Sequence, residues 1–309
     1  MIEVRNLIKY YGSKIALNDL SFDVHKGEIL GFLGPNGAGK STTMKIITGF
    51  LSSTEGNVTV DGLDVFNDSL EVRKLIGYLP EHPPLYLDMT VKDYLYFAAR
   101  IKGVSRKHIK EAVDTNVEKC NLQKYYNAYC KSLSKGYRQR VGIAQAIVHD
   151  PSILILDEPT IGLDPIQIVE IRNLIKSFGG EHTVILSTHI LPEVEMTCER
   201  VIIINDGRVV AEDLTSNLKS DTDKSRIVLV EYDGQSSNIY SMIEKIKNVE
   251  HVEKETADSG KSLLKVTTKS GCDMRPEIAK SIISENLELL EMKYFTKSLE
   301  QIFVNITMN

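Results

Sequence analysis

The stretch Gly34-Pro35-Asn36-Gly37-Ala38-Gly39-Lys40-Ser41 decides the fold of this chain. It fits the pattern G-x-x-x-x-G-K-[ST], in which glycines let backbone N–H groups curl around phosphate oxygens. In such a loop Lys40 reaches the β- and γ-phosphates, and the hydroxyl of Ser41 is offered to Mg²⁺. The alternative is a plain glycine turn between a strand and a helix. The pattern predicts a site for a nucleoside triphosphate.

The residues on either side of the loop supply the context that a phosphate loop requires. Glu28 to Leu33 reads as a short apolar strand, and a helix is predicted from about Lys40 to Phe50. The start of a helix attracts anions because its first N–H groups have no partner within the helix. Thr42, in the first turn, is included among the predicted nucleotide contacts. Strand before and helix after favour phosphate binding over a plain turn.

A second apolar strand, Ile153 to Leu156, ends in the two carboxylates Asp157 and Glu158. In P-loop nucleotide hydrolases such a strand delivers its first carboxylate to the Mg²⁺ side of the nucleotide. Glu158 would then face the attacking water, as general base or as the group that positions it. Alone, the pair would be an ordinary strand end. With the phosphate loop, it predicts hydrolysis of the bound nucleotide.

The composition is typical of a globular protein with one large domain and a smaller one. The chain has 309 residues, of which 42% are hydrophobic and 26% charged, and its net charge is −5. The acidic balance argues against nucleic acid as a partner. Four cysteines without a CxxC pair fit a reduced cytoplasmic protein. No apolar run approaches the roughly 20 residues of a membrane-spanning helix.

Strands and helices alternate along residues 1–218, which predicts an α/β domain with a largely parallel central sheet. Within it, residues from about 85 to 150 read as a helical subdomain, in which Thr90 and Asp93 form a capping box. A polar stretch marks the predicted boundary. Residues 219–309 then read as strand, helix, strand, strand, helix, strand and a last helix from Ser298. This order predicts a small ferredoxin-like α+β module.

Three further segments narrow the prediction. Leu133-Ser134-Lys135-Gly136-Tyr137-Arg138-Gln139-Arg140 precedes a helix, for which Ser134 is a suitable N-cap. Gly162-Leu163-Asp164-Pro165 lies just after Glu158. Ser187-Thr188-His189 follows an apolar strand, which brings His189 to the nucleotide edge of the sheet.

The order of these motifs resembles the nucleotide-binding domain of ABC transporters over some two thirds of the chain. The resemblance implies that Tyr11 stacks on adenine; the alternative is a turn aromatic at the edge of the core. It also implies a head-to-tail dimer of two copies, in which Ser134 and Gly136 of the signature motif contact the γ-phosphate of ATP held by the other subunit. Asp164 would cross the dimer interface, and His189 would contact the γ-phosphate.

Two departures from the family pattern are visible. Lys135 and Tyr137 replace Gly and Gln of the usual LSGGQ signature. Glu81 follows Gly77-Tyr78-Leu79-Pro80, at the position where the family usually has a glutamine. Glu81 is included among the predicted metal contacts. A carboxylate oxygen can still serve Mg²⁺, but glutamate lacks the amide donor.

The segment from Tyr78 to Tyr86, YLPEHPPLY, resembles the exporter-type subgroup that pairs with ABC-2 permeases, which includes antibiotic exporters and the gliding-motility GldA type. The resemblance implies an ATPase on the cytoplasmic face of the membrane, held there by a separate permease, with a dimerising or regulatory C-terminal module. Two alternatives are a soluble ABC ATPase acting on ribosomes or DNA and a regulatory subunit with little ATPase activity. A single cassette, an acidic balance and no long heptad run disfavour the first.

Overall fold

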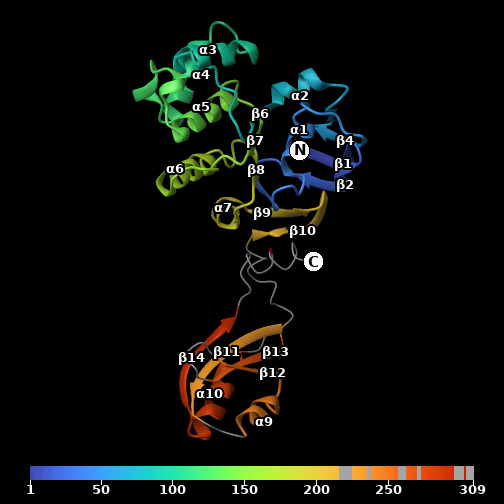
Figure 1. Ribbon diagram of the computed structural model, residues 1–309, viewed down its shortest axis with the longest axis vertical. Coiled ribbons are helices and arrows are strands. Elements are labelled where there is room, and N and C mark those ends of the chain that lie inside the picture. Colours follow the sequence, from blue (N-terminus) through green and yellow to red (C-terminus); the bar gives the residue numbers. More distant parts are fainter. Residues whose placement is uncertain (216–224, 235–237, 257–261, 270–272, 296–302, 304–309) are drawn as a thin grey trace. The chain divides into compact units, whose positions relative to one another are not determined.

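A computed structural model describes residues 1–215, 225–234, 238–256, 262–269, 273–295 and 303 (Figure 1). The chain divides into two compact units, one spanning Met1–Thr215 and the other lying within Ser216–Asn305. The boundary predicted at residues 218/219 lies outside the described residues, as does the helix predicted from Ser298, apart from Phe303. Each unit is described by itself below.

A six-stranded sheet forms the centre of the first unit, in the order β10-β9-β3-β8-β7-β6. Its strands pair in parallel except for the β9–β10 hairpin. Every residue of β3 and β7 is buried, because a parallel sheet is covered on both faces. The predicted α/β class with a largely parallel sheet is confirmed. The strands are β3 (Ile29–Leu33), β6 (Ile76–Leu79), β7 (Ile153–Asp157), β8 (Thr183–Thr188), β9 (Arg200–Asn205) and β10 (Arg208–Leu214).

A second, antiparallel sheet packs against the first through α1 (Lys40–Ile47). Its order is β2-β1-β4-β5, with β1 (Ile2–Tyr11), β2 (Lys14–Val24), β4 (Glu55–Val60) and β5 (Leu63–Asp64). Side chains such as Met44 and Ile47 of α1 are fully buried between the sheets. The helix that follows the phosphate loop is therefore locked into the core.

The helices α3, α4 and α5 gather on one side of the first unit, apart from α1 (Figure 1). The hydroxyl of Thr90 accepts a hydrogen bond from the Asp93 N–H at 3.1 Å and so caps α3, as predicted. The helices of the unit are α1, α2 (Ser69–Leu75), α3 (Val91–Ile101), α4 (Ile109–Lys119), α5 (Lys135–Ile147), α6 (Pro165–Lys176) and α7 (Leu191–Thr197). Among the described residues of the chain, none of the helices has the length and apolarity needed to cross a membrane.

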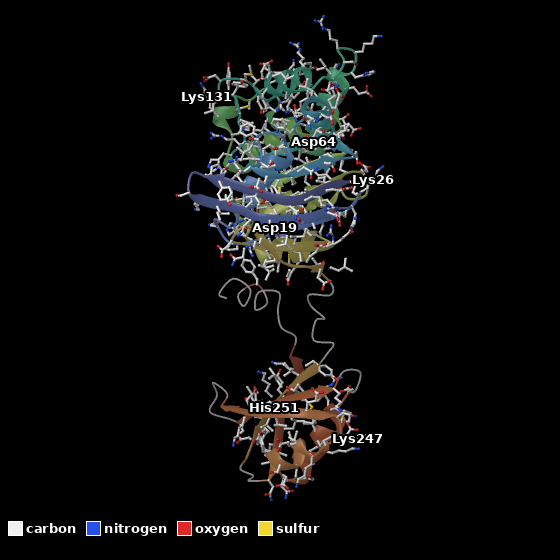
Figure 2. The ribbon with its side chains drawn as sticks, turned by 90° about the vertical axis from the view of Figure 1, so that its right-hand side faces the viewer. Asp19, Lys26, Asp64, Lys131, Lys247 and His251 are labelled. Carbon is white, nitrogen blue, oxygen red and sulfur yellow. The ribbon has the colours of Figure 1, made fainter. Side chains whose placement is uncertain are left out.

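Up to its last strand, the described part of the second unit has the predicted order of strands and helices. Its antiparallel sheet runs β12-β13-β11-β14, and its core joins the sheet to α9 and α10. Charged and polar side chains such as Lys247 and His251 lie on its surface (Figure 2). The elements are β11 (Ser225–Asp233), α9 (Ile239–Glu244), β12 (Val249–Thr256), β13 (Ser262–Lys269), α10 (Arg275–Ser284) and β14 (Glu288–Phe295).

Candidate nucleotide site

The phosphate loop joins the end of β3 to the start of α1 along a path that excludes larger residues. Gly39, at the N-cap of α1, has a φ of 107°, which only glycine adopts readily. A Cβ atom added to Gly34 would lie 2.5 Å from the carbonyl oxygen of Ile204. The glycines therefore let the backbone turn tightly against its neighbours, as the sequence pattern predicts.

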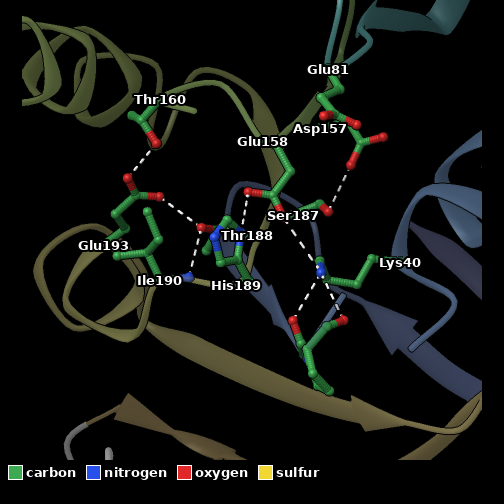
Figure 3. A network of polar contacts seen from close by, with 12 residues as sticks. Lys40, Glu81, Asp157, Glu158, Thr160, Ser187, Thr188, His189, Ile190 and Glu193 are labelled. Carbon is green, nitrogen blue, oxygen red and sulfur yellow. Dashed lines mark hydrogen bonds and ion pairs between the residues drawn. The ribbon is translucent and has the colours of Figure 1, made fainter. Parts of the chain in front are cut away.

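Lys40 is held beneath this loop. Its side chain is only 6% exposed, and its ammonium donates hydrogen bonds to the carbonyls of Gly34 at 2.8 Å and Pro35 at 3.1 Å. The same nitrogen lies 3.4 Å from Oε1 of Glu158 (Figure 3). A lysine in this position already points at the space inside the loop, and its charge is balanced by a carboxylate from another strand.

Asp157 is the last residue of β7 and is almost fully buried. Its Oδ1 accepts a hydrogen bond from the Ser187 hydroxyl at 2.8 Å. Burial raises the pKa of this carboxyl, and the hydrogen bonds from Ser187 and Ser41 oppose that rise. The nearby charges of Glu158 and Glu81 raise the pKa further. Three carboxylates thus crowd one edge of the loop, where a cation would relieve their repulsion.

Glu158, the next residue, has a φ of 50°, which is unusual for a residue other than glycine. This left-handed turn, held by a hydrogen bond from its N–H to the Ser187 carbonyl at 2.9 Å, points the side chain in a different direction from that of Asp157 (Figure 3). There Oε2 accepts from Nδ1 of His189 at 2.8 Å, while Oε1 faces Lys40 (Figure 3). The two carboxylates at the strand end therefore have different partners.

Four of the predicted groups meet because parallel strands end at one edge of the sheet. The phosphate loop follows β3, the two carboxylates lie at the end of β7, and His189 follows β8, the strand between them. Glu81 also lies beside Asp157 (Figure 3).

The signature residues lie elsewhere. Ser134 caps α5 by accepting from the Tyr137 N–H at 3.5 Å, and Gly136 packs closely on Gln167 of α6. No hydrogen bond or ion pair joins either residue to the phosphate loop within the described part of the chain. Lys135, which departs from the family pattern, lies against Gly162, two residues before Asp164. The ring of Tyr137 lies against that of Tyr125, with centroids 4.0 Å apart and ring planes tilted by 45°.

Tyr11 lies at the end of β1 and is 49% exposed. The ammonium of Lys9 lies 5.6 Å from the centre of its ring. An exposed ring is available for stacking, and the role predicted for Tyr11 stays a prediction.

Comparison with known proteins identifies the family. The sequence profile described as ABC transporter matches residues 17–161. The chain is 32% identical over 310 residues to the uncharacterized ABC transporter ATP-binding protein YhcH of Bacillus subtilis, an alignment that covers 99% of this chain and 96% of that protein. This chain belongs to the ABC transporter ATP-binding proteins. The family predicted from the order of the motifs is confirmed.

Two further proteins, one similar in sequence and one solved structure similar in fold, are informative for this ABC ATPase. The bacitracin transport ATP-binding protein BcrA of Bacillus licheniformis is 39% identical over 221 residues, which cover 71% of each chain. The dimeric cassette MJ0796, solved in a post-hydrolysis state bound to ADP and Pi, is similar in fold with a TM-score of 0.63 and 27% identity. That likeness covers 70% of this chain and 99% of the solved one. As a family member, this chain binds and hydrolyses ATP.

Three residues to which the sequence analysis assigned no role complete the polar network of the cassette. Glu193 of α7 is buried and bonds to the hydroxyls of Thr160 and Thr188 (Figure 3). In the sequence, Glu193 looks like a surface residue of a short amphipathic helix. Only the fold shows that both threonines converge on it.

Asp157→Asn is expected to raise the thermal stability of the nucleotide-free cassette at pH 7.5 by about 2–4 °C. The pKa of Asp157 is higher in the folded chain than its unfolded value of about 3.9, so the ionised carboxylate costs stability at neutral pH. That cost is absent below the unfolded pKa, and the difference between variant and wild type should shrink toward pH 4. Thermal unfolding at both pH values measures it.

Asp88→Asn, at a surface carboxylate paired with Lys131 at 3.0 Å, is the matched control and should change little. A lower unfolding temperature for Asp157→Asn at pH 7.5 would mean that the hydrogen bonds from Ser187 and Ser41 outweigh the burial of the charge.

Proposed function

We propose that this chain is the ATP-hydrolysing subunit of a membrane exporter and drives a separate ABC-2-type permease by ATP-dependent dimerisation on the cytoplasmic face of the membrane. The observation that carries the proposal is the meeting of Lys40, Asp157, Glu158 and His189 at the phosphate loop. The name of BcrA, a bacitracin transport protein, and the exporter-like segment from Tyr78 to Tyr86 support the exporter class.

ATP would bind with its phosphates in the loop from Gly34 to Ser41 and against Thr42. The ammonium of Lys40 then turns from the loop carbonyls and Glu158 to the β- and γ-phosphates, which are stronger acceptors. This exchange frees Oε1 of Glu158 to orient the attacking water and accept its proton. Binding of the substrate thus activates the base.

The residues at the strand edge fit Mg²⁺. Mg²⁺ is usually held by one or two carboxylates together with substrate phosphates rather than by a full protein cage. Asp157 and the Ser41 hydroxyl offer such a partial set, with Glu81 close by. When bound, the ion would neutralise charge that develops on the phosphates. Asp157 and Ser41 would hold it, and the crowding of three carboxylates supports a cation there.

His189 completes the site on the γ-phosphate side. A carboxylate only accepts hydrogen bonds, so Nδ1 of His189 carries the proton that Glu158 accepts at 2.8 Å. This bond orients both side chains before ATP arrives. We assign His189 the γ-phosphate contact, so that loss of the γ-phosphate after hydrolysis removes one of the interactions that keep the dimer closed.

A second copy would supply the signature residues. Ser134 and Gly136 lie at the start of α5, whose first N–H groups favour an anion. Among the residues that the structure describes, no hydrogen bond or ion pair joins them to their own phosphate loop. A head-to-tail dimer would place them on the γ-phosphate held by the partner. The solved cassette MJ0796, which is a dimer, supports this arrangement.

An apolar groove offers a place for the permease. Its volume is about 1040 Å³, and its lining includes the exposed side chains of Phe50, Leu70 and Ile101. Exposed apolar patches of this kind mark protein–protein contacts. The groove is also lined by Tyr78 and by Pro80, the residue directly before Glu81. A permease segment in the groove would therefore press on the segment that carries Glu81 to Asp157.

A membrane pull-down tests the proposal. Tagged full-length chain, recovered from solubilised membranes of its own organism, is expected to bring down a multi-span permease. Phe50→Asp should reduce that recovery about tenfold or more, because it places a charge in the groove. Ile283→Asp, at another exposed apolar position, in α10, is the control. Recovery of ribosomes or DNA in place of a multi-span protein would support the soluble alternative and overturn the proposal.

A further inference from the structure

Glu193 is a buried carboxylate without a cationic partner in the described part of the chain. Glu193 is only 3% exposed and lies near the start of α7. Both its oxygens accept from hydroxyls: Oε2 from Thr188 at 2.8 Å and Oε1 from Thr160. Burying a carboxylate costs free energy unless hydrogen bonds satisfy its oxygens. A carboxylate that is buried among hydroxyl donors therefore calls for an explanation of its role.

The two threonines belong to the two segments that carry the proposed catalytic side chains. Thr160 lies two residues after Glu158, and Thr188 lies directly before His189. The Thr188 hydroxyl also accepts from the N–H of Ile190 at 3.0 Å, so it spans His189 on both sides. Because that hydroxyl has a single proton, the proton points at Glu193. The carboxylate is therefore the common acceptor for both segments (Figure 3).

The helix that carries Glu193 is itself fixed to the core. A Cβ atom on Gly31 of β3 would lie 2.7 Å from a methyl group of Val194, the next residue in α7. The glycine permits this close approach, and Val194 is fully buried. Glu193 thus reaches its partners from a helix packed on the strand that leads into the phosphate loop.

We infer that Glu193 is a positioning residue of the ATPase site: it bridges the Thr160 and Thr188 segments and sets the distance between Glu158 and His189. It touches neither substrate nor reacting atoms. The inference rests on the roles proposed above for Glu158 and His189. Since Thr160 also opens the segment that ends at Asp164, the bridge links the catalytic edge to the residue predicted at the dimer interface.

The bridge is tested by a double-mutant cycle on the full-length chain, with the ATP turnover number and the dissociation constant of ATP both measured. Thr160→Val and Thr188→Val each remove one hydroxyl and keep the side-chain shape. Each should lower turnover about tenfold or more, as expected for a lost hydrogen bond to a charged group, with ATP affinity changed less than twofold. The double variant should be no slower than the slower single one, because cutting either end opens the same bridge.

Conservative and disruptive changes at Glu193 separate positioning from folding. In Glu193→Gln the amide oxygen can accept from Thr188 while the amide nitrogen donates to the Thr160 oxygen, so turnover should stay within threefold of wild type. Glu193→Leu should match the slower threonine variant. If the leucine variant fails to fold, the threonine cycle carries the test alone.

Two results would overturn the inference: threonine effects that multiply in the double variant, or a loss of ATP affinity in proportion to the loss of turnover. Either would assign the threonines independent or purely structural roles. Failure of the proposed function can be distinguished from failure of this inference. A wild-type chain without ATPase activity, or a fully active Glu158→Gln variant, would contradict the proposed function independently of the double-mutant cycle.

Discussion

Replacement of Glu158 by glutamine is expected to lower the ATP turnover number by about 10²–10⁴-fold while ATP still binds. Glutamine has the same size and can keep the left-handed backbone at this position, where φ is 50°. It cannot accept the proton of the attacking water. Phosphate release measures turnover, and equilibrium binding of ATP to the same variant measures affinity.

The variant should also accumulate as an ATP-bound dimer, because the γ-phosphate that holds two copies together is no longer removed. Size-exclusion chromatography with and without Mg-ATP detects this shift. Glu181→Gln, at an exposed glutamate, is the control and should behave like wild type. A Glu158→Gln chain with full turnover would remove Glu158 from the mechanism and leave His189 as the remaining candidate for organising the water.

The central sheet was readable in the sequence because its strands are apolar along their whole length. β3 and β7 are buried on both faces, so each appears as an uninterrupted apolar run followed by the functional residues. By contrast, β4 exposes Glu55 and Asn57 and contains Gly56, which has a φ of 76°. Its place in the antiparallel sheet depends on pairing with β1, some fifty residues away in the sequence. No local sequence pattern predicts that pairing.

The site was predictable as far as parallel topology determines it. Once β3, β7 and β8 are neighbours, the groups that follow them must share an edge, which brings Lys40, Glu158 and His189 together. The bridge through Glu193 was not predictable, since hydroxyl and carboxyl groups from three separate segments carry no spacing rule. The interface roles of the signature residues also depend on a second copy, which one chain cannot display.

Lys40→Ala is expected to weaken ATP binding by about a hundredfold or more. The ammonium would make hydrogen bonds to two charged phosphates, and each bond to a charged group contributes about 1.5–3 kcal/mol. The Lys40 ammonium lies beneath the loop, 2.8 Å from the Gly34 carbonyl oxygen. Within the described polar network of Figure 3, no second lysine or arginine is present to replace it. Titration calorimetry with Mg-ATP measures the affinity, and Lys45→Ala, at an exposed lysine of the same helix, should bind like wild type.

A general loss of folding would weaken binding too, and the ion pair with Glu158 offers a way to tell the two apart. Lys40→Ala leaves the buried Glu158 carboxylate without its cation, 3.4 Å away in the wild type, so the variant should also unfold at a lower temperature. Adding Glu158→Gln removes that unpaired charge and should restore much of the thermal stability. ATP binding should stay lost in the double variant, because the phosphates still lack the ammonium. Recovery of affinity together with stability would show instead that Lys40 acts through the fold and not on the nucleotide.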